Sequence, residues 1–447
     1  MRNTLPRPAS RTRTGLTMAA WLRDLGLSGR RQLALLRLRT QRLQAARNVR
    51  LALTTLADSA GQEASEPHPR NRQLLVDVSV IVRGDARTGI QRVVRAIVQQ
   101  LLVDPPAGFD VKPVCASRWQ GYRHATLHIW PERIPAAVGP VDVGKGDVFL
   151  GLDFAAHLLS RHQVQLARWK MAGARIIVVV YDLLPALHPK WFEAKDVRSY
   201  LDWIRAVAIH ADRVLCISAA SADEMHRWLA RHHPGVEKYM EISWFHLGAD
   251  IAASVPASGV SPDFDFRFQR IVARQAILMV GTVEPRKGHA QALQALEQLW
   301  RQGKQINLAI VGKPGWRVEM LVKRLREHPE SGHRLFWIED ASDEMLCRLY
   351  EHAAGLLMAS EGEGFGLPLI EAACHGVPIL ARDLAVFREI AGNHATYFSG
   401  HSGHELAIAI SAWSDELSRG KAIRPDGIPH LSWHESTRQL LSRLELP

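Results

Sequence analysis

The sequence has few cysteines and no long uncharged apolar run, and both shortages limit what the chain can be. Its 4 cysteines, Cys115, Cys216, Cys347 and Cys374, form no C-x-x-C pair, and none has a histidine at metal-ligand spacing. The pattern argues against a disulfide framework and a zinc site, and it favours reduced thiols in the cytoplasm. No apolar stretch reaches the length of about 18 residues that a membrane-spanning helix needs. The first residues also lack the apolar core of a secretory signal.

The body of the chain lacks a surplus of positive charge, although the whole sequence carries +11 and has a pI near 9.8. Residues 1–72 hold 14 arginines, no lysine and 4 acidic residues, which leaves residues 73–447 near +1. A protein that binds a polyanion needs basic residues over its folded surface. A basic nucleic-acid-binding protein is therefore the weaker alternative, and we expect no nucleic acid among the partners.

Residues 1–72 are predicted to be a basic arm and linker. Leucines and arginines in Arg31–Leu56 recur at helical spacing, which predicts an amphipathic helix. Such a helix can lie on an anionic membrane surface, with arginine on lipid phosphates and leucine in the acyl boundary. The alternatives are an ordinary surface helix, or sequence upstream of a true start at Met18. Ala57–Asn71 has the composition of a linker.

Downstream, short apolar runs alternate with longer helical stretches, a pattern that favours an α/β fold with parallel sheets covered on both faces. Strands are predicted at Leu74–Val82, Val148–Leu152, Arg175–Tyr181, Arg213–Ile217, Glu241–His246, Ala276–Gly281, Ile306–Val311, Leu335–Ile338, Gly355–Met358, Val377–Ala381 and Thr396–Phe398. Helices are predicted at Ile90–Leu102, Ala219–His232, His289–Gln302 and Ser342–Ala353. The polar stretch Ala249–Arg270 is predicted to link two doubly wound, Rossmann-like domains, with ligands bound where the carboxyl ends of their strands face each other.

The most informative segment is Ser360–Cys374 (SEGEGFGLPLIEAAC), which follows an apolar strand and opens a helix. The amides around Gly364 and Gly366 are placed to meet a phosphate at a helix N-terminus. Glu363 precedes the turn, so it is better suited to accept hydrogen bonds from sugar hydroxyls, and Glu371 inside the helix suits a ribose. Without further information, a glycine-rich turn with two surface acids remains the alternative.

A second segment, Val280–His289 (VGTVEPRKGH), carries adjacent cations after another strand. Arg286 and Lys287 stand beside Gly281, and such cations suit a diphosphate, above all while negative charge grows on a departing nucleotide. Glu284 is predicted to orient the pair. The alternative is a solvated loop.

Two further motifs lie in the first half. In Asp85–Arg95 (DARTGIQRVVR), Thr88 is predicted to cap a helix that Gly89 opens, and a plain capped helix is the alternative. In Val180–Pro189 (VYDLLPALHP), Asp182 follows a strongly apolar strand, either as a supporting or acceptor-contacting residue or as the cap of a turn before Pro185.

These segments together resemble the retaining glycosyltransferase family 4, also called group 1. The match rests on two glutamates, Glu363 and Glu371, separated by seven residues, followed by HGVPILA at His375–Ala381, and on the Arg286–Lys287 element. The resemblance implies a GT-B fold, in which two Rossmann-like domains face each other across a cleft. It implies domains at residues 73–265 (acceptor) and 266–430 (donor), with residues 431–447 forming a helix that returns to the first domain.

The family's site residues carry over as follows. The resemblance implies that Glu363 contacts the donor sugar, that Glu371 binds the ribose, and that Arg286 and Lys287 hold the diphosphate, with Asp182 in support. The implied donor-binding set is Gly89, Gly281, Glu284, Gly364, Phe365, Gly366, Leu367 and Glu371. Related enzymes often have a histidine where this chain has Tyr181, so no histidine role carries over there.

The implied activity is retaining, metal-independent transfer of a hexosyl residue, mannose or rhamnose, from a GDP- or dTDP-linked donor. The implied acceptor is a glycan or lipid-linked glycan in bacterial surface-polysaccharide and lipopolysaccharide synthesis, with a cytoplasmic enzyme that touches the inner membrane through residues 31–56. No cofactor and no metal is expected, and the D-x-D at Asp263–Asp265 is discounted because it falls in the predicted linker. The rival enzyme is a nucleotide-sugar 2-epimerase of the same architecture.

Overall fold

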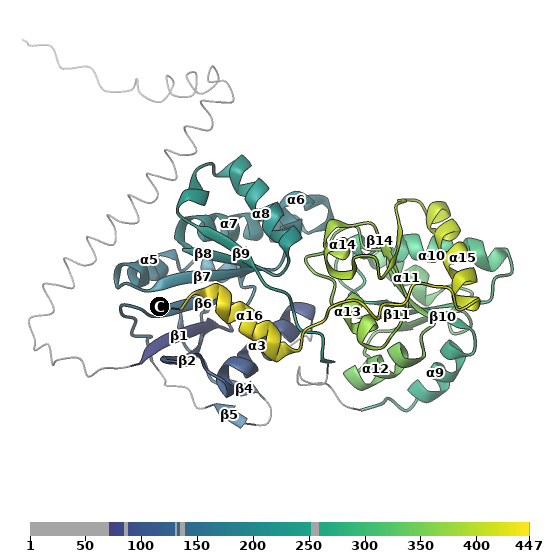
Figure 1. The fold of residues 1–447 in the computed structure, drawn as a ribbon, viewed down its shortest axis with the longest axis horizontal. Coiled ribbons are helices and arrows are strands. Elements are labelled where there is room, and N and C mark those ends of the chain that lie inside the picture. Colours follow the sequence, from purple (N-terminus) through teal and green to yellow (C-terminus); the bar gives the residue numbers. More distant parts are fainter. Residues whose placement is uncertain (1–70, 85–87, 130–131, 135–138, 252–258, 447) are drawn as a thin grey trace, which may run out of the picture.

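The computed structural model describes residues 71–84, 88–129, 132–134, 139–251 and 259–446. These residues form two α/β domains on separate, mainly parallel sheets, which lie side by side in Figure 1. The predicted helix at Arg31–Leu56 lies outside the described residues, as does nearly all of the predicted linker after it. Within the described part, no helix is long and apolar enough to cross a membrane.

The first domain contains a seven-stranded sheet in the order β3-β2-β1-β6-β7-β8-β9, in which β3 alone runs antiparallel to its neighbour. Its strands are β1 (Arg72–Asp77), β2 (Phe109–Cys115), β3 (Arg123–His124), β6 (Val148–Gly151), β7 (Arg175–Val180), β8 (Arg213–Cys216) and β9 (Glu241–Trp244), and β4 (Leu127–Ile129) and β5 (Glu132–Ile134) form a separate hairpin. Its helices are α3 (Gly89–Val103), α4 (Ala156–Leu159), α5 (Gln163–Met171), α6 (Leu184–Leu187), α7 (Ala194–His210) and α8 (Ala219–His232).

The second domain contains a six-stranded parallel sheet in the order β12-β11-β10-β13-β14-β15. Its strands are β10 (Gln275–Val280), β11 (Ile306–Val311), β12 (Leu335–Ile338), β13 (Gly355–Met358), β14 (Ile379–Arg382) and β15 (Thr396–Phe398). Its helices are α9 (Phe264–Val272), α10 (His289–Arg301), α11 (Glu319–Arg326), α12 (Asp343–His352), α13 (Leu367–Cys374), α14 (Ala385–Ala391) and α15 (Gly403–Ser418), and α16 (Trp433–Leu444) follows.

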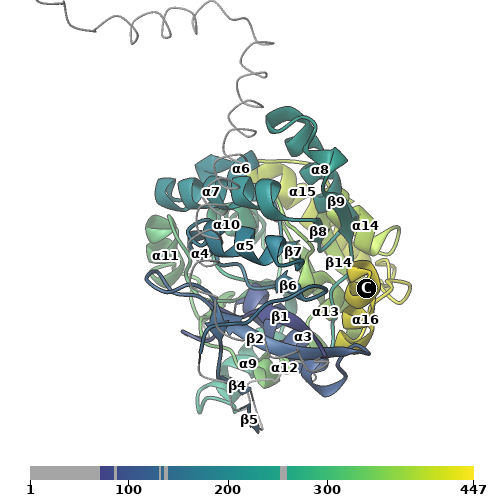
Figure 2. The same ribbon diagram turned by 90° about the vertical axis from the view of Figure 1, so that its left-hand side faces the viewer.

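Both sheets are covered on two faces, as their apolar strands require. In β7, Ile176 and Val178 pack with the α4, α5, α7 and α8 layer, whereas Ile177 and Val179 pack with α3. Successive side chains of a strand point to opposite faces, so a run without polar residues must be buried on both. Figure 2 shows α5 and α7 on one side of this sheet and α3 on the other. The predicted fold class, two doubly wound α/β domains, is confirmed.

Most predicted elements agree with the structure, and the differences have local causes. Helix α8 and strand β11 occur with the predicted bounds. Strand β2 was not predicted, because Pro113 and two charged residues interrupt its apolar pattern. Pro113 is tolerated in β2 because this strand lies next to the short edge strand β3.

The predicted linker Ala249–Arg270 is too long. Phe264 and Phe268 are buried on α9, and the side chain of Asn307 donates to the carbonyls of Arg270 and Ile271, which fixes this helix on the second sheet. The boundary placed between residues 265 and 266 therefore falls inside a helix. Asp265 of the D-x-D sequence forms an ion pair of 2.9 Å with Arg348.

The order of each sheet identifies where a ligand would bind. In the second domain the order reverses between β10 and β13, and in the first domain it reverses between β1 and β6. Doubly wound sheets bind ligands beyond the carboxyl ends of the strands at such switch points. The loop after β10 carries the arginine–lysine segment that was singled out in the sequence. The loop after β13 begins the segment with the two glutamates.

Helix α16 returns from the second domain to pack on the first (Figure 1). Trp433 is 1% exposed, its backbone N–H donates to the carboxylate of Asp250 at 2.9 Å, and its indole N–H donates to the Asp250 carbonyl at 3.1 Å. Further along, the guanidinium of Arg175 donates to the carbonyl of Leu444. The last helix is therefore part of the first domain's core.

We expect Trp433→Ala to lower the thermal unfolding midpoint strongly, because removing a buried tryptophan costs about 3–5 kcal/mol. Trp119→Ala is the matched control, since Trp119 is 82% exposed. Differential scanning calorimetry of both variants checks this. Equal midpoints would show that α16 contributes little to the fold.

Candidate active site

Three loops at the carboxyl ends of strands meet where the domains touch. Two belong to the second domain and follow β10 and β13, and the third follows β7 of the first domain. The contact is close at Gly364, where an added Cβ would lie 2.0 Å from the carbonyl oxygen of Tyr181. Only glycine fits there. The hydroxyls of Ser218 and Ser221 also donate to the Gly364 carbonyl, at 2.7 and 3.2 Å, from the N-terminus of α8.

The predicted acid and cations contact one another directly. The Glu363 carboxylate accepts from Lys287 Nζ at 2.5 Å, from Arg286 Nη1 at 3.0 Å and from the Ser360 hydroxyl at 2.7 Å. Arg286 Nε forms a second ion pair with Glu284 at 2.9 Å. All four charged side chains are largely buried, so the cluster holds its charges in fixed positions out of water.

These contacts shift the pKa values of the acids in opposite directions. Burial raises the pKa of Glu363, but Lys287 and Arg286 outweigh burial and lower it to about 2. Burial raises the pKa of Glu284 and also that of Asp182, against the lowering effect of Arg286. Glu363 is therefore a carboxylate at neutral pH, available to accept hydrogen bonds.

Glu371 lies inside α13 and is held from two sides. Its Oε1 accepts from Arg92 at 2.5 Å and its Oε2 accepts from the Tyr350 hydroxyl at 2.9 Å. Arg92 belongs to α3 of the first domain and also bonds Asp343 at the start of α12. This guanidinium thus joins the two domains. From the sequence, Arg92 was interpreted as a structural or acceptor-side residue, and its bond to Glu371 was not predicted.

The remaining predicted residues line the same boundary. Gly89 opens α3, and a Cβ there would lie 3.7 Å from Leu367 Cδ1 of α13. Gly366 is left-handed at the N-terminus of α13, and Phe365 is buried against the ring of His246. Gly281 lies beside the amine of Lys287. The structure brings all of these residues together, and their roles towards a donor stay predictions.

Asp182 caps a turn, which is one of the two roles that the sequence suggested for this residue. Its carboxylate accepts from the N–H of Leu184 at 3.0 Å, and its backbone carbonyl accepts from the Tyr200 hydroxyl at 2.7 Å. A Cβ at Gly364 would lie 3.1 Å from Asp182 Cβ, which places Asp182 beside the residue that follows Glu363. The neighbouring Tyr181 is buried and donates to the carbonyl of Leu152, so it forms part of the core.

Two interdomain contacts have no signal in the sequence. Glu389 of α14 accepts from the N–H groups of Ala219 and Ala220, both at 2.8 Å, and contacts His246 Nε2 at 2.7 Å. On the other side, the Trp316 indole donates to the carbonyl of Trp191 at 2.8 Å. A helix N-terminus attracts a carboxylate from any element that reaches it, and residue spacing along the chain does not reveal which one does.

Comparison with known proteins gives one family match. Residues 263–421 match the family model described as glycosyl transferases group 1. A serotype-specific mannosyltransferase, WbdA of Escherichia coli, is 42% identical over 380 residues, which cover 84% of this chain and 46% of that protein. The O-antigen chain mannosyltransferase B of Escherichia coli is 34% identical over 180 residues, covering 38% of this chain and 45% of that protein. The chain thus spans about half the length of these curated relatives.

A solved structure agrees with the fold. The Anabaena protein Alr3699/HepE, in complex with UDP and glucose, superposes with a TM-score of 0.56 at 15% identity, covering 83% of this chain and 99% of that one. At this identity the likeness concerns the fold, which is the two-domain GT-B arrangement that the sequence resemblance implied.

We expect Lys287→Met to raise the pKa of Glu363 from about 2 towards or beyond its ordinary value of 4.5. One of the two cations that counteract the effect of burial is then missing. In the native chain the ionised Glu363 carboxylate stabilises the fold. This contribution is fully present above pH 4.5 and is lost as the pH falls towards 2. A titration of the glutamate carboxyl carbons by NMR measures the shift.

Lys304→Met is the control, because Lys304 pairs with Asp415 at 2.8 Å away from the cluster. An unchanged Glu363 titration in Lys287→Met would contradict the argument that the cations set this pKa.

We expect Gly364→Ala to separate the two domains, because the new methyl group would overlap the Tyr181 carbonyl. Small-angle scattering should show a larger radius of gyration. Gly84→Ala, where an added Cβ meets nothing within 4 Å, is the control. Identical scattering from both variants would mean that Gly364 does not limit the approach of the domains.

Proposed function

We propose that this chain, which matches the group 1 glycosyltransferases over residues 263–421, is a member of that family. It would transfer a mannosyl residue from a nucleotide-diphosphate sugar, GDP-mannose first among the candidates, to a glycan acceptor. The mannosyltransferase relatives support the sugar, and the GT-B fold supports a nucleotide-sugar donor. Synthesis of a bacterial surface polysaccharide is the setting that the relatives' names suggest.

The observation that carries the proposal is the buried contact of Glu363 with Arg286 and Lys287 at the switch point of the second domain. A donor diphosphate would take up the two cations, which would stabilise the negative charge of the departing nucleotide. Glu363, kept ionised by these cations, would then accept hydrogen bonds from the donor sugar's hydroxyls. The N-terminus of α13 would add its free amides beside the phosphates.

This arrangement supports a reaction that needs neither a metal nor another cofactor. Two fixed cations and a helix N-terminus can supply the positive charge that a metal would otherwise give to the leaving diphosphate. We propose retention of configuration, with the acceptor hydroxyl entering on the face that the nucleotide leaves. Asp182 would support the acceptor side, since it lies next to the cluster on the first domain.

Donor binding would require a change at Glu371. Both of its oxygens are engaged, by Arg92 and Tyr350, and the side chain is only 4% exposed. A ribose that bonds Glu371 needs this side chain to be uncovered, which displacement of Arg92 would achieve. We propose that α3 moves with the donor, and that the domains separate at this point when the nucleotide enters or leaves.

The alternatives have less support. The relatives reported above are transferases, and nothing found favours the epimerase. The near-neutral charge of residues 73–447 still opposes a nucleic-acid-binding protein. A cytoplasmic location with peripheral membrane contact through residues 31–56, and a lipid-linked acceptor, remain proposals. Deletion of residues 1–70 followed by vesicle sedimentation tests that contact, and undiminished sedimentation would reject it.

We expect Glu363→Gln and Arg286→Gln each to reduce mannosyl transfer from GDP-mannose to an oligomannose acceptor by roughly 10²-fold, as for loss of one charge-stabilising donor in an active site. Release of nucleotide and the anomeric configuration of the product, read by NMR, provide the measurement. Lys304→Met is the control for a lost surface cation.

Native turnover in Glu363→Gln would remove this residue from the site. An inverted anomer would reject retention. Loss of activity in EDTA that Mg²⁺ restores would reject metal independence.

A further inference from the structure

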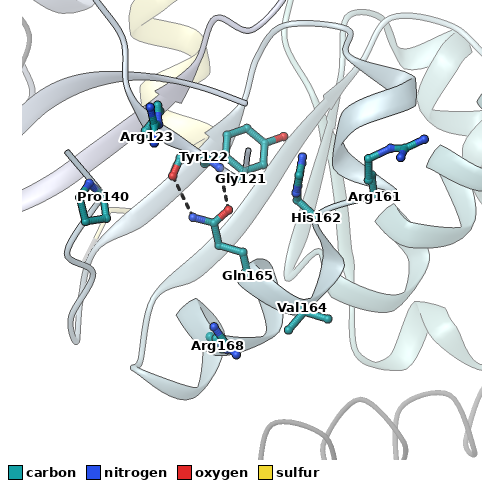
Figure 3. A pocket seen from close by; sticks show the side chains of 9 residues that line it. All are labelled: Gly121, Tyr122, Arg123, Pro140, Arg161, His162, Val164, Gln165 and Arg168. Atoms are coloured by element: carbon teal, nitrogen blue, oxygen red, sulfur yellow. Dashed lines mark hydrogen bonds between the residues drawn. The ribbon is translucent and has the colours of Figure 1, made fainter. Parts of the chain in front are cut away.

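We propose that a groove on the first domain, lined by Arg123, Arg161 and Arg168, binds a phosphate group carried by the acceptor molecule. The groove has a volume of about 410 Å³ and is drawn in Figure 3. Small-molecule sites commonly occupy about 300–1,000 Å³. Its phosphate-binding chemistry does not depend on the proposed transfer activity, whereas the assignment of the phosphate to the acceptor does.

The three groove arginines differ from surface arginines that pair with carboxylates, such as Arg324 with Glu297 at 2.6 Å and Arg388 with Asp383 at 2.8 Å. None of the three groove arginines forms an ion pair with any carboxylate of the described residues. They place three positive charges around one groove, which favours an anionic ligand.

Neighbouring groups add to this positive field. The pKa of His157 is lowered by partial burial and by the charges of Arg83 and Arg161. Arg83, which acts on the same histidine, donates to the carbonyl of Ala116. Tyr122, which lines the groove, donates to the buried carboxyl of Asp77, and burial raises the pKa of Asp77 to about 7. The raised pKa reduces the negative charge that this carboxyl sets against the arginines.

The floor of the groove is rigid. Gln165 Oε1 accepts from the Tyr122 N–H at 2.7 Å, and its amide donates back to the Tyr122 carbonyl at 2.9 Å, as the dashed lines in Figure 3 show. A Cβ at Gly121 would lie 2.4 Å from Gln165 Oε1, so the amide occupies the space of a side chain. Tyr122 is 2% exposed and its hydroxyl donates to Asp77 at 3.1 Å.

This floor fixes the backbone from which Arg123 rises, while α5 and the turn before it carry Arg168 and Arg161. The side chains themselves are exposed and able to turn towards a ligand. Guanidinium groups bind phosphate oxygens through paired N–H donors, which makes phosphate the anion that best fits several arginines on a polar rim.

The groove is separate from the donor residues. It lies at the β2–β3 edge of the first sheet, whereas Gly364 and the charge cluster contact the loops after β7 and β8, towards the other edge. The first domain is the side from which an acceptor would approach. A phosphate there would anchor a large acceptor at a second point, away from the sugar that receives the transfer.

The test compares the full chain with two charge-matched variants. Arg123→Glu with Arg168→Glu reverses the charge of two of the three groove arginines, and Arg198→Glu with Arg231→Glu makes the same charge change at exposed positions on α7 and α8. The donor cluster is intact in all three proteins. Inorganic pyrophosphate is titrated by calorimetry, and thermal unfolding confirms that each variant is folded.

We expect the groove variant to lose about tenfold or more in affinity for one of its pyrophosphate sites, as for lost charge-assisted hydrogen bonds, while the control stays like the native chain. Equal titrations in all three proteins would overturn the proposal. Because no transfer is measured, an inactive enzyme would not affect this result.

A second experiment distinguishes a phosphate carried by the acceptor from the lipid headgroups of a membrane surface. The three proteins are sedimented with phosphatidylcholine vesicles, with and without phosphatidylglycerol. Equal sedimentation of the groove variant and the control supports a phosphate carried by the acceptor. Loss of sedimentation in the groove variant alone would overturn that assignment in favour of lipid headgroups.

Discussion

The site depends on a buried ion cluster that neutralises itself. Arg286 and Lys287 lie against Glu363, and Arg286 also pairs with Glu284, all largely out of water. Burying an unpaired charge costs several kcal/mol, so each of these groups requires the others. A donor diphosphate would bring its negative charge to the same two cations. Glu363, still beside them and ionised, would accept hydrogen bonds from sugar hydroxyls.

The two domains meet through contacts that hold the cluster in place. Gly364, immediately after Glu363, is held by two serine hydroxyls of α8, and Glu389 in turn satisfies the N-terminus of that helix. Arg92 crosses in the other direction to Glu371. Each bond is of the strong, charge-assisted or buried type, and the bond between Arg92 and Glu371 joins a helix of one domain to a helix of the other. The domain boundary is therefore polar and specific, which fixes how the two domains dock.

Sequence patterns predicted the fold and the members of the site better than the contacts between them. The strand after Gln275 and the helix after Gly366 follow from apolar runs and glycine turns, which act within a few residues along the chain. The pairing of Arg92 with Glu371 spans 279 positions and follows from how two domains dock, which no local pattern encodes. The strand containing Pro113 was missed for the opposite reason, because tertiary pairing with β1 overrides its poor local preference. The helix at Phe264 was missed since its polar face resembles a linker.

The return of α16 to the first domain has a consequence for synthesis. Leu440 and Leu444 fill the core of a domain whose other elements lie between Arg72 and Trp244, before the whole second domain in the sequence. Domains usually fold as they leave the ribosome, the N-terminal one first. Here an apolar face of the first domain stays uncovered until the second domain has been translated and α16 emerges. The nascent chain is thus exposed to aggregation for the length of that delay, and a chaperone that shields the face beside α3 would be most useful during it.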